Sequence, residues 1–267
     1  AVSGGPDSVA LCDVTERLCR ETGHPHVALI VDHGLRTESA DEALSVQARL
    51  VELGIEAGPL TVMVPPPLSG KLAWARQQRF ALLTSYVRAR RGILMFGHHR
   101  DDQAETVGMR LAHGSGFGGA RGILPVRFFA GVLCVRPFLS ISKQALVHYC
   151  KKTGLTSVAD PSNNHRVYER VRMRALLDDE PHISGQLIRF SYASHRLSKV
   201  LQRNIQAFSK RYCRSEPLMT CIDLTAFQRA PLLLRLQLIK QTLMRHGAPD
   251  YPPSEASVTK AIQAVFE

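Results

Sequence analysis

The sequence has 267 residues, of which 45% are hydrophobic and 21% charged, a composition typical of a globular protein with one large and one smaller domain. Its uninterrupted aliphatic runs reach about five residues, whereas a membrane-spanning helix needs about 20, so we expect no membrane-embedded segment. The net charge of +11 favours a polyanionic partner such as a nucleic acid, although charge alone does not require one.

The cysteines indicate the redox environment of the protein, and the first residues indicate where its N-terminus lies. The six cysteines form no C-x-x-C pair, which favours buried free thiols over metal ligands or disulfides and predicts a reducing, cytoplasmic location. The chain starts at Ala1, directly before its first polar motif. Because a buried strand of normal length should precede that motif, we expect the true N-terminus to lie further upstream.

Short apolar runs alternate with amphipathic stretches in the first part of the chain. Helix stop signals, mostly glycines, separate them. Such alternation predicts an α/β fold, a Rossmann-like parallel sheet with helices on both faces. The expected strands are 26–31, 60–64, 93–96 and 132–135. Five helices are expected: one that follows Ser8, one that begins at Ser39, one that spans 72–91, one that begins near Asp101, and one that ends at Gly154.

Beyond about residue 184 the alternation fades. Residues 198–212 and 231–246 have helical apolar spacing with basic residues in between, and residues 219–224 are compatible with a short strand. We therefore predict two domains, a catalytic domain over residues 1–185 and a smaller, mainly helical domain over residues 186–267.

The segment Ser3-Gly-Gly-Pro-Asp-Ser8 lies where a strand turns into a helix. Its two glycines allow backbone angles closed to other residues and a close approach to a ligand, and Pro6 suits a first helical turn. The amides and dipole at such a helix start favour phosphate, to which Ser3 and Ser8 add hydroxyl groups. Asp7 fits beside phosphate if it caps the helix or faces a magnesium ion.

Two further polar segments follow predicted strands, Asp32–Arg36 and Gly97–Thr106. Ligands of parallel sheets bind beyond the carboxyl ends of the strands, so the three segments converge on one predicted ligand edge. The third segment places Asp101, Asp102 and Glu105 in the first turns of a helix, where the dipole favours anions. Helix capping by any one of these acids remains an alternative, and a transition-metal site with His98 and His99 is disfavoured because further ligands at typical spacing are missing.

An ordered set of motifs resembles those of one family. Ser3–Ser8 resembles the SGGxDS loop of the PP-loop ATP-pyrophosphatases, which split ATP between its α- and β-phosphates. The rest of the set is similar to motifs of the tRNA(Ile)-lysidine synthetases, and together they span about residues 1–175: Val31–Arg36, Ala75-Arg76 with Arg79-Phe80, Gly97–Thr106, the glycines 114, 116, 119 and 122, Arg136–Leu139, and Asp160–Asn163. The family has a long form with further C-terminal domains, so this chain resembles a short or truncated form.

The resemblance implies an ATP-dependent C–N ligase. Its substrates would be ATP with Mg²⁺, L-lysine and the wobble cytidine of tRNA(Ile) with a CAU anticodon. In that reaction, attack of the C2 oxygen of the cytidine on ATP expels pyrophosphate, and the lysine ε-amine then displaces AMP to form lysidine. Free lysine has a pKa of about 10.4, so the enzyme must hold an ammonium group and accept its proton, a task that suits carboxylates.

The resemblance also implies roles for individual residues. The phosphate-binding residues would be Ser3, Gly4, Gly5, Pro6, Asp7 and Ser8, and magnesium would be held by Asp7 or Asp32. Catalytic positions would be Asp32, Arg36, Arg76, Asp101, Asp102 and Glu105, with the acids facing magnesium or the lysine amine and the arginines neutralising phosphate charge.

A basic run, Arg166, Arg170, Arg172 and Arg174, follows the last of these motifs. Such spacing suits contacts with several tRNA phosphates, although a solvated helical face is the alternative. The run departs from the family at Val171, where an asparagine is usual. A PP-loop tRNA thiolase and a non-catalytic ATP-binding module remain alternative functions, and the sequence leaves the oligomeric state open.

Overall fold

The computed structural model describes the chain apart from residues 35–38, 117, 157–168, 248–252, 254 and 267. Arg36, Arg166 and the predicted motif at 160–163 lie outside the described residues. The described elements are, in chain order, α1 (Pro6–Thr22), β1 (Ala28–Asp32), α2 (Ser39–Glu52), β2 (Ala57–Thr61), α3 (Lys71–Ala89), β3 (Ile93–Met95), α4 (Arg100–Ala112), η1 (Gly119–Arg121), β4 (Val126–Phe129), β5 (Val132–Val135), α5 (Lys143–Lys152), α6 (Glu169–Asp179), α7 (Pro181–Tyr212), β6 (Cys213–Ser215), β7 (Thr220–Ile222), α8 (Leu224–Arg229), α9 (Leu232–His246) and α10 (Glu255–Phe266).

The chain divides into two compact units, one made of residues 1–109 and 122–188 and the other of residues 110–121 and 189–267. The division near residue 188 lies close to the boundary expected from the fading of the strand–helix alternation. Residues 110–121 group with the second unit, which the sequence pattern does not indicate.

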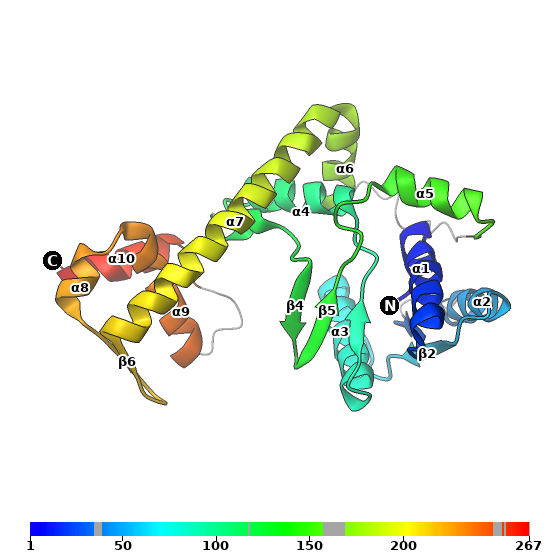
Figure 1. Ribbon diagram of the computed structural model, residues 1–267, viewed down its shortest axis with the longest axis horizontal. Coiled ribbons are helices and arrows are strands. Elements are labelled where there is room, and N and C mark those ends of the chain that lie inside the picture. Colours follow the sequence, from blue (N-terminus) through cyan, green and yellow to red (C-terminus); the bar gives the residue numbers. More distant parts are fainter. Residues whose placement is uncertain (35–38, 117, 157–168, 248–252, 254, 267) are drawn as a thin grey trace. The chain divides into compact units, whose positions relative to one another are not determined.

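Parallel strand pairing builds the first unit. β1 pairs in parallel with β2, β3 pairs in parallel with β5, and β4 joins β5 as an antiparallel edge (Figure 1). Ala1 and Val2 lie between the two groups of strands, because Val2 forms a parallel bridge with Ile30 of β1 and the nitrogen of Ala1 donates a hydrogen bond to the carbonyl oxygen of Met95 in β3 (2.8 Å).

Helices cover both faces of this sheet, as alternate residues of β1 demonstrate. Ala28 and Ile30 belong to a core cluster with side chains of α1 and α2, whereas Leu29 belongs to a second cluster with Leu83 of α3 and Leu94 of β3. Successive side chains of a strand point to opposite faces, so the two clusters lie on opposite sides of the sheet. The predicted α/β architecture is confirmed.

Two strands differ from their predictions. The strand expected at 60–64 was wrong in position, because β2 ends at Thr61 and leaves Met63 87% exposed. The pairing with β1 selects a segment that contains Pro59, a residue tolerated in edge strands. β4 was not predicted, although Ala130 and Gly131 at positive φ (47° and 77°) form the two-residue turn typical of a β-hairpin between it and β5.

The second unit is mainly helical. Its core combines side chains of α7, α8, α9 and α10, and the small antiparallel hairpin β6–β7 packs partly against it: Ile205, Phe227, Leu234, Leu238, Val258 and Ile262 are its buried members. The helices and the short strand expected from the sequence are present here. Among the described residues no helix combines the length and the apolar character needed to cross a membrane. All six cysteines fall within the described residues and are free thiols.

Candidate active site

The loop Ser3–Ser8 is fixed by its own hydroxyl groups at the start of α1. Gly5 is the N-cap of the helix, Pro6 occupies its first turn, and Gly4 has a φ of 82° that favours glycine. The Ser8 hydroxyl donates to the Gly5 carbonyl (2.9 Å) and accepts from the Ser3 amide (3.2 Å). These bonds shape a compact turn at the positive end of the helix dipole, where an anion such as phosphate is favoured.

The segment that follows β3 lies directly against this loop. A Cβ atom at Gly97 would lie 2.8 Å from the carbonyl oxygen of Asp7, closer than carbon and oxygen tolerate. Gly97 is therefore needed for the backbone of one segment to approach that of the other. The contact confirms that at least two of the three predicted ligand-edge segments meet.

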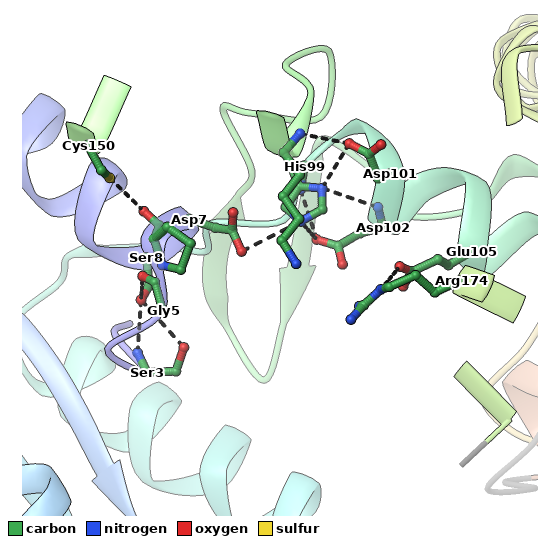
Figure 2. A network of polar contacts seen from close by, with 12 residues as sticks. Ser3, Gly5, Asp7, Ser8, His99, Asp101, Asp102, Glu105, Cys150 and Arg174 are labelled. Atoms are coloured by element: carbon green, nitrogen blue, oxygen red, sulfur yellow. Dashed lines mark hydrogen bonds and ion pairs between the residues drawn. The ribbon is translucent and has the colours of Figure 1, made fainter. Parts of the chain in front are cut away.

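His99 lies at the centre of the acidic groups (Figure 2). Its side chain is 3% exposed, and its Nε2 lies 3.6 Å from Asp7 Oδ2 and 3.5 Å from Asp102 Oδ2. Its Nδ1 lies 3.4 Å from Asp101 Oδ2. The same Asp101 oxygen accepts the amide of Lys143 (2.8 Å), the first residue of α5. The starts of α1, α4 and α5 are thus connected through one imidazole and its carboxylate partners.

The two adjacent histidines titrate in opposite directions. Burial would lower the pKa of His99, but the carboxylates of Asp101, Asp7 and Asp102 outweigh it and raise the pKa to about 9, so the ring is an imidazolium at neutral pH. The hydrogen-bonded His99 in turn lowers the pKa of Asp101 to about 2. Burial lowers the pKa of His98 to about 4, with Asp102 opposing and nearby arginines reinforcing the shift, so His98 is neutral.

The remaining acids of α4 are paired with arginines of α6. Asp102 caps its own helix by accepting the His99 amide at Oδ2 (2.9 Å), and its Oδ1 accepts Arg170 (2.6 Å). Glu105 is only 2% exposed, and its two oxygens accept Arg170 (2.6 Å) and Arg174 (2.7 Å). Two members of the predicted tRNA-binding run therefore contact the predicted catalytic acids, while Arg172 lies exposed on the same helix.

Further cations gather near these acids. Burial and then the positive charges of Arg76 and Arg170 lower the pKa of Arg79, and burial and then Arg170 lower that of Arg76. Within the described part of the chain, the Nε atoms of Arg79 and Arg136 are buried without a hydrogen-bond partner. Cations that repel one another and keep unused donors indicate a site for an anion such as phosphate. Of these three arginines only Arg76 has a role predicted from the sequence, although Arg79 and Arg136 belong to the family-like motifs.

Asp32 is 8% exposed at the end of β1. Its Oδ1 accepts the Gly34 amide (2.9 Å) and the Ser39 hydroxyl (2.7 Å), which ties the strand end to the start of α2. Of the two predicted magnesium ligands, Asp7 fits better, because its Oδ1 is buried and lacks a hydrogen-bond partner among the described residues. No group of three or more His, Cys, Asp or Glu side chains among those residues is arranged to hold a metal ion.

Gln103 is a residue whose part the sequence analysis missed. Its side-chain oxygen accepts the Ile123 amide (2.6 Å) and its side-chain nitrogen donates to the Ile123 carbonyl (3.3 Å). Gly122, at a φ of 65°, lies so close that an added Cβ would be 2.7 Å from the Gln103 oxygen. Gly122, the last glycine of the predicted glycine-rich loop, therefore allows the backbone at Ile123 to pack closely against Gln103 of α4.

Comparison with known proteins identifies the class first. Residues 1–180 match the family model of the PP-loop domain, so the chain belongs to the PP-loop proteins. Within them it belongs to the tRNA(Ile)-lysidine synthase family: it is 32% identical over its whole length to the tRNA(Ile)-lysidine synthase of Bradyrhizobium diazoefficiens, of which it covers 77%.

Other relatives are more similar over shorter stretches. The tRNA(Ile)-lysidine synthases of Zymomonas mobilis and Methylobacterium nodulans are 38% and 39% identical over 70% and 78% of this chain. The chain spans only 57% and 60% of their lengths. A solved U34-tRNA thiolase from Methanococcus maripaludis, with its [4Fe-4S] cluster, shares the fold with a TM-score of 0.60 at 19% identity, over 73% of this chain and 70% of the thiolase chain.

Replacing Gly4 by Val should nearly abolish ATP binding. A β-branched side chain is strained at the φ of 82° and blocks the approach of a phosphate to the loop. We expect an affinity for ATP at least about 100-fold lower by titration calorimetry, with Gly23→Val as the control for a strained glycine at the other end of α1, at a φ of 70°. ATP affinity equal to wild type in Gly4→Val would rule out the Ser3–Ser8 loop as the phosphate site.

Proposed function

We propose that this chain ligates lysine to C2 of the wobble cytidine of tRNA(Ile), through an adenylated cytidine, with release of pyrophosphate and AMP. The observation that carries the proposal is the junction of the Ser3–Ser8 loop with the buried acids of α4, beside unpaired arginine donors. One place then offers groups for phosphate, for an ammonium ion and for the proton it loses. The names and identities of the relatives support the same reaction.

The residues divide the work by charge. The Ser3–Ser8 loop binds the phosphates, and Arg76, Arg79 and Arg136 neutralise the charge that develops on them. Asp7 would hold Mg²⁺ through its unpartnered oxygen, and a bound Mg²⁺ would supply charge stabilisation at the phosphates. The lysine amine approaches Asp102 and Glu105. Its ammonium group shares these carboxylates with the guanidinium of Arg170 or replaces that guanidinium. Asp32 ties the end of β1 to the start of α2 rather than reacting.

Product analysis tests the reaction. The chain is incubated with ATP, magnesium, lysine and unmodified tRNA(Ile) bearing the CAU anticodon, and each component is left out in turn. We expect AMP and pyrophosphate that require tRNA, and transfer of labelled lysine to the tRNA. ADP and phosphate as the main products would exclude adenylation. AMP release with no lysine in the tRNA would favour a different nucleophile, as in a thiolase, and binding of ATP without turnover would favour a non-catalytic module.

Arg172 is the described member of the basic run that we propose for tRNA phosphates, because its side chain is exposed on α6. Replacing Arg172 by Ala should weaken tRNA binding and lower the slope of log affinity against log salt by up to about 1, since one fewer counterion is released. Filter binding across a salt series measures both. Arg20→Ala, in the last turn of α1, is a charge-matched control that should leave the slope unchanged.

The corresponding change at Arg170 should act differently. Arg170→Ala leaves Asp102 and Glu105 short of a partner, so we expect a lower melting temperature.

An unchanged salt slope in folded Arg172→Ala would show that this side chain does not contact the tRNA backbone.

A further inference from the structure

His99 occupies a position that the sequence motif alone does not explain. It is the N-cap residue of α4, yet its ring is turned inward, 3% exposed, with Asp7 on one side and Asp101 and Asp102 on the other (Figure 2). Both ring nitrogens are within 3.6 Å of carboxylate oxygens. A ring so enclosed cannot reach a substrate, so any part it plays in the reaction acts through its neighbours.

Asp7 is the neighbour through which it can act. The Oδ2 atom of Asp7 faces His99 Nε2, whereas Oδ1 is buried and has no hydrogen-bond partner among the described residues. A carboxylate with one oxygen held and the other unused has its direction fixed toward whatever the second oxygen binds. The backbone contact between Gly97 and Asp7 brings the segment that contains His99 close to Asp7, but it does not orient the Asp7 side chain.

We propose that His99 is a positioning residue whose Nε2 holds Asp7 so that its second oxygen faces the ATP site, and whose Nδ1 anchors this arrangement to Asp101. The inference rests on the proposed function for its kinetic consequence. Asp101 continues the link by accepting the Lys143 amide at the start of α5, so the ring is held from a third helix. A misplacement of about 1 Å in a catalytic group costs up to about 100-fold in rate, which sets the expected scale.

Two amide substitutions separate the functions of the two ring nitrogens. The amide of Gln lies close to the Nε2 position of histidine and retains a donor toward Asp7, whereas the amide of Asn lies close to the Nδ1 position and retains a donor toward Asp101. We expect His99→Asn to lower kcat for AMP formation about 100-fold and His99→Gln about 10-fold or less, with similar melting temperatures. The KM for lysine should change less than kcat, because Asp102 keeps its bonds to the backbone amide of residue 99 and to Arg170 in both variants.

A double-mutant cycle tests the route through Asp7. In an Asp7→Asn background, His99→Asn should produce little further loss, because the side chain it positions is already altered. A full, multiplicative loss in that background would overturn the proposal. So would equal kcat values for His99→Asn and His99→Gln in folded protein, since that is the result of a purely structural role.

The wild-type control keeps this inference distinct from the proposed function. If wild type releases no AMP, the proposed function fails, and the inference is then judged by the affinity for ATP in the presence of magnesium. His99→Asn should weaken that affinity more than His99→Gln does. Equal affinities would overturn the positioning role, whereas the expected order would support it whatever reaction the site catalyses.

Discussion

Replacing Glu105 by Ala is expected to lower the free energy of unfolding by about 1.5 to 3 kcal/mol, the range for losing hydrogen bonds to charged groups, because the Arg170 and Arg174 side chains left behind are 39% and 30% exposed. Glu105 is 2% exposed and accepts Arg170 and Arg174 through separate oxygens at 2.6 and 2.7 Å. Its removal leaves two guanidinium groups next to a cavity and beside other cations. Urea unfolding followed by circular dichroism measures the change.

Two companion variants make this result specific. Glu105→Gln retains the volume and a hydrogen-bond acceptor but loses the charge, so its loss should lie between wild type and Glu105→Ala. Glu21→Ala removes an exposed acid of α1 and should change the free energy of unfolding by about 0.5 kcal/mol or less. A Glu105→Ala protein as stable as the Glu21→Ala control would show that the α4–α6 ion pairs contribute nothing to the fold.

The second large effect is a loss of stability at alkaline pH that originates at His99. The pKa of His99 is raised from 6.5 to about 9 in the folded protein, chiefly because the carboxylates of Asp101, Asp7 and Asp102 outweigh its burial. Its stabilisation is therefore complete below pH 6.5 and is lost as the pH rises through about 9. A shift of that size corresponds to about 3 kcal/mol. Melting temperatures at pH 6.5 and pH 9 report this loss.

His98 contributes to a fall on the acid side, together with the Ala1 amino group, whose pKa burial lowers from 8.0 to about 6. Burial lowers the pKa of His98 from 6.5 to about 4, so the unfolded chain binds a proton in this range that the folded protein does not, and stability declines as the pH falls from 6.5 toward 4. The alkaline loss should shrink in His99→Gln and the acid loss in His98→Gln. A wild-type melting temperature that is flat from pH 6.5 to 9 would contradict the charged state of His99.

The glycine-rich loop, the segment after β3 and the alternation of strands and helices were predictable because each depends on local sequence. Ser3–Ser8 contains its own turn residues and caps, and Gly97–Thr106 has a strand end and a helix start within a few residues. The rule that ligands collect at the carboxyl ends of parallel strands then placed them together, and the contact of Gly97 with Asp7 confirms it.

The partners of the acids were not predictable in the same way. Arg170 lies 65 residues from Glu105 in the chain, and a run of arginines looks the same whether it faces solvent, tRNA or a buried carboxylate. The orientation of the His99 ring was unpredictable for the same reason, since a His-His pair in the sequence does not indicate which ring is enclosed by acids. The position of β2 failed for another reason: the apolar Met63 and Val64 are 87% and 55% exposed, so an apolar run did not mark the paired residues.

The close stacking of Gly97 on the Asp7 carbonyl has a thermodynamic corollary. Because the two backbones touch, we expect, on the proposed function, that a nucleotide at the Ser3–Ser8 loop and an amine at the α4 acids alter one another's binding. Linkage makes such an effect reciprocal: whatever factor nucleotide contributes to the affinity for the amine, the amine contributes to the affinity for nucleotide. Titrations of nucleotide and amine run in either order should therefore give the same coupling free energy.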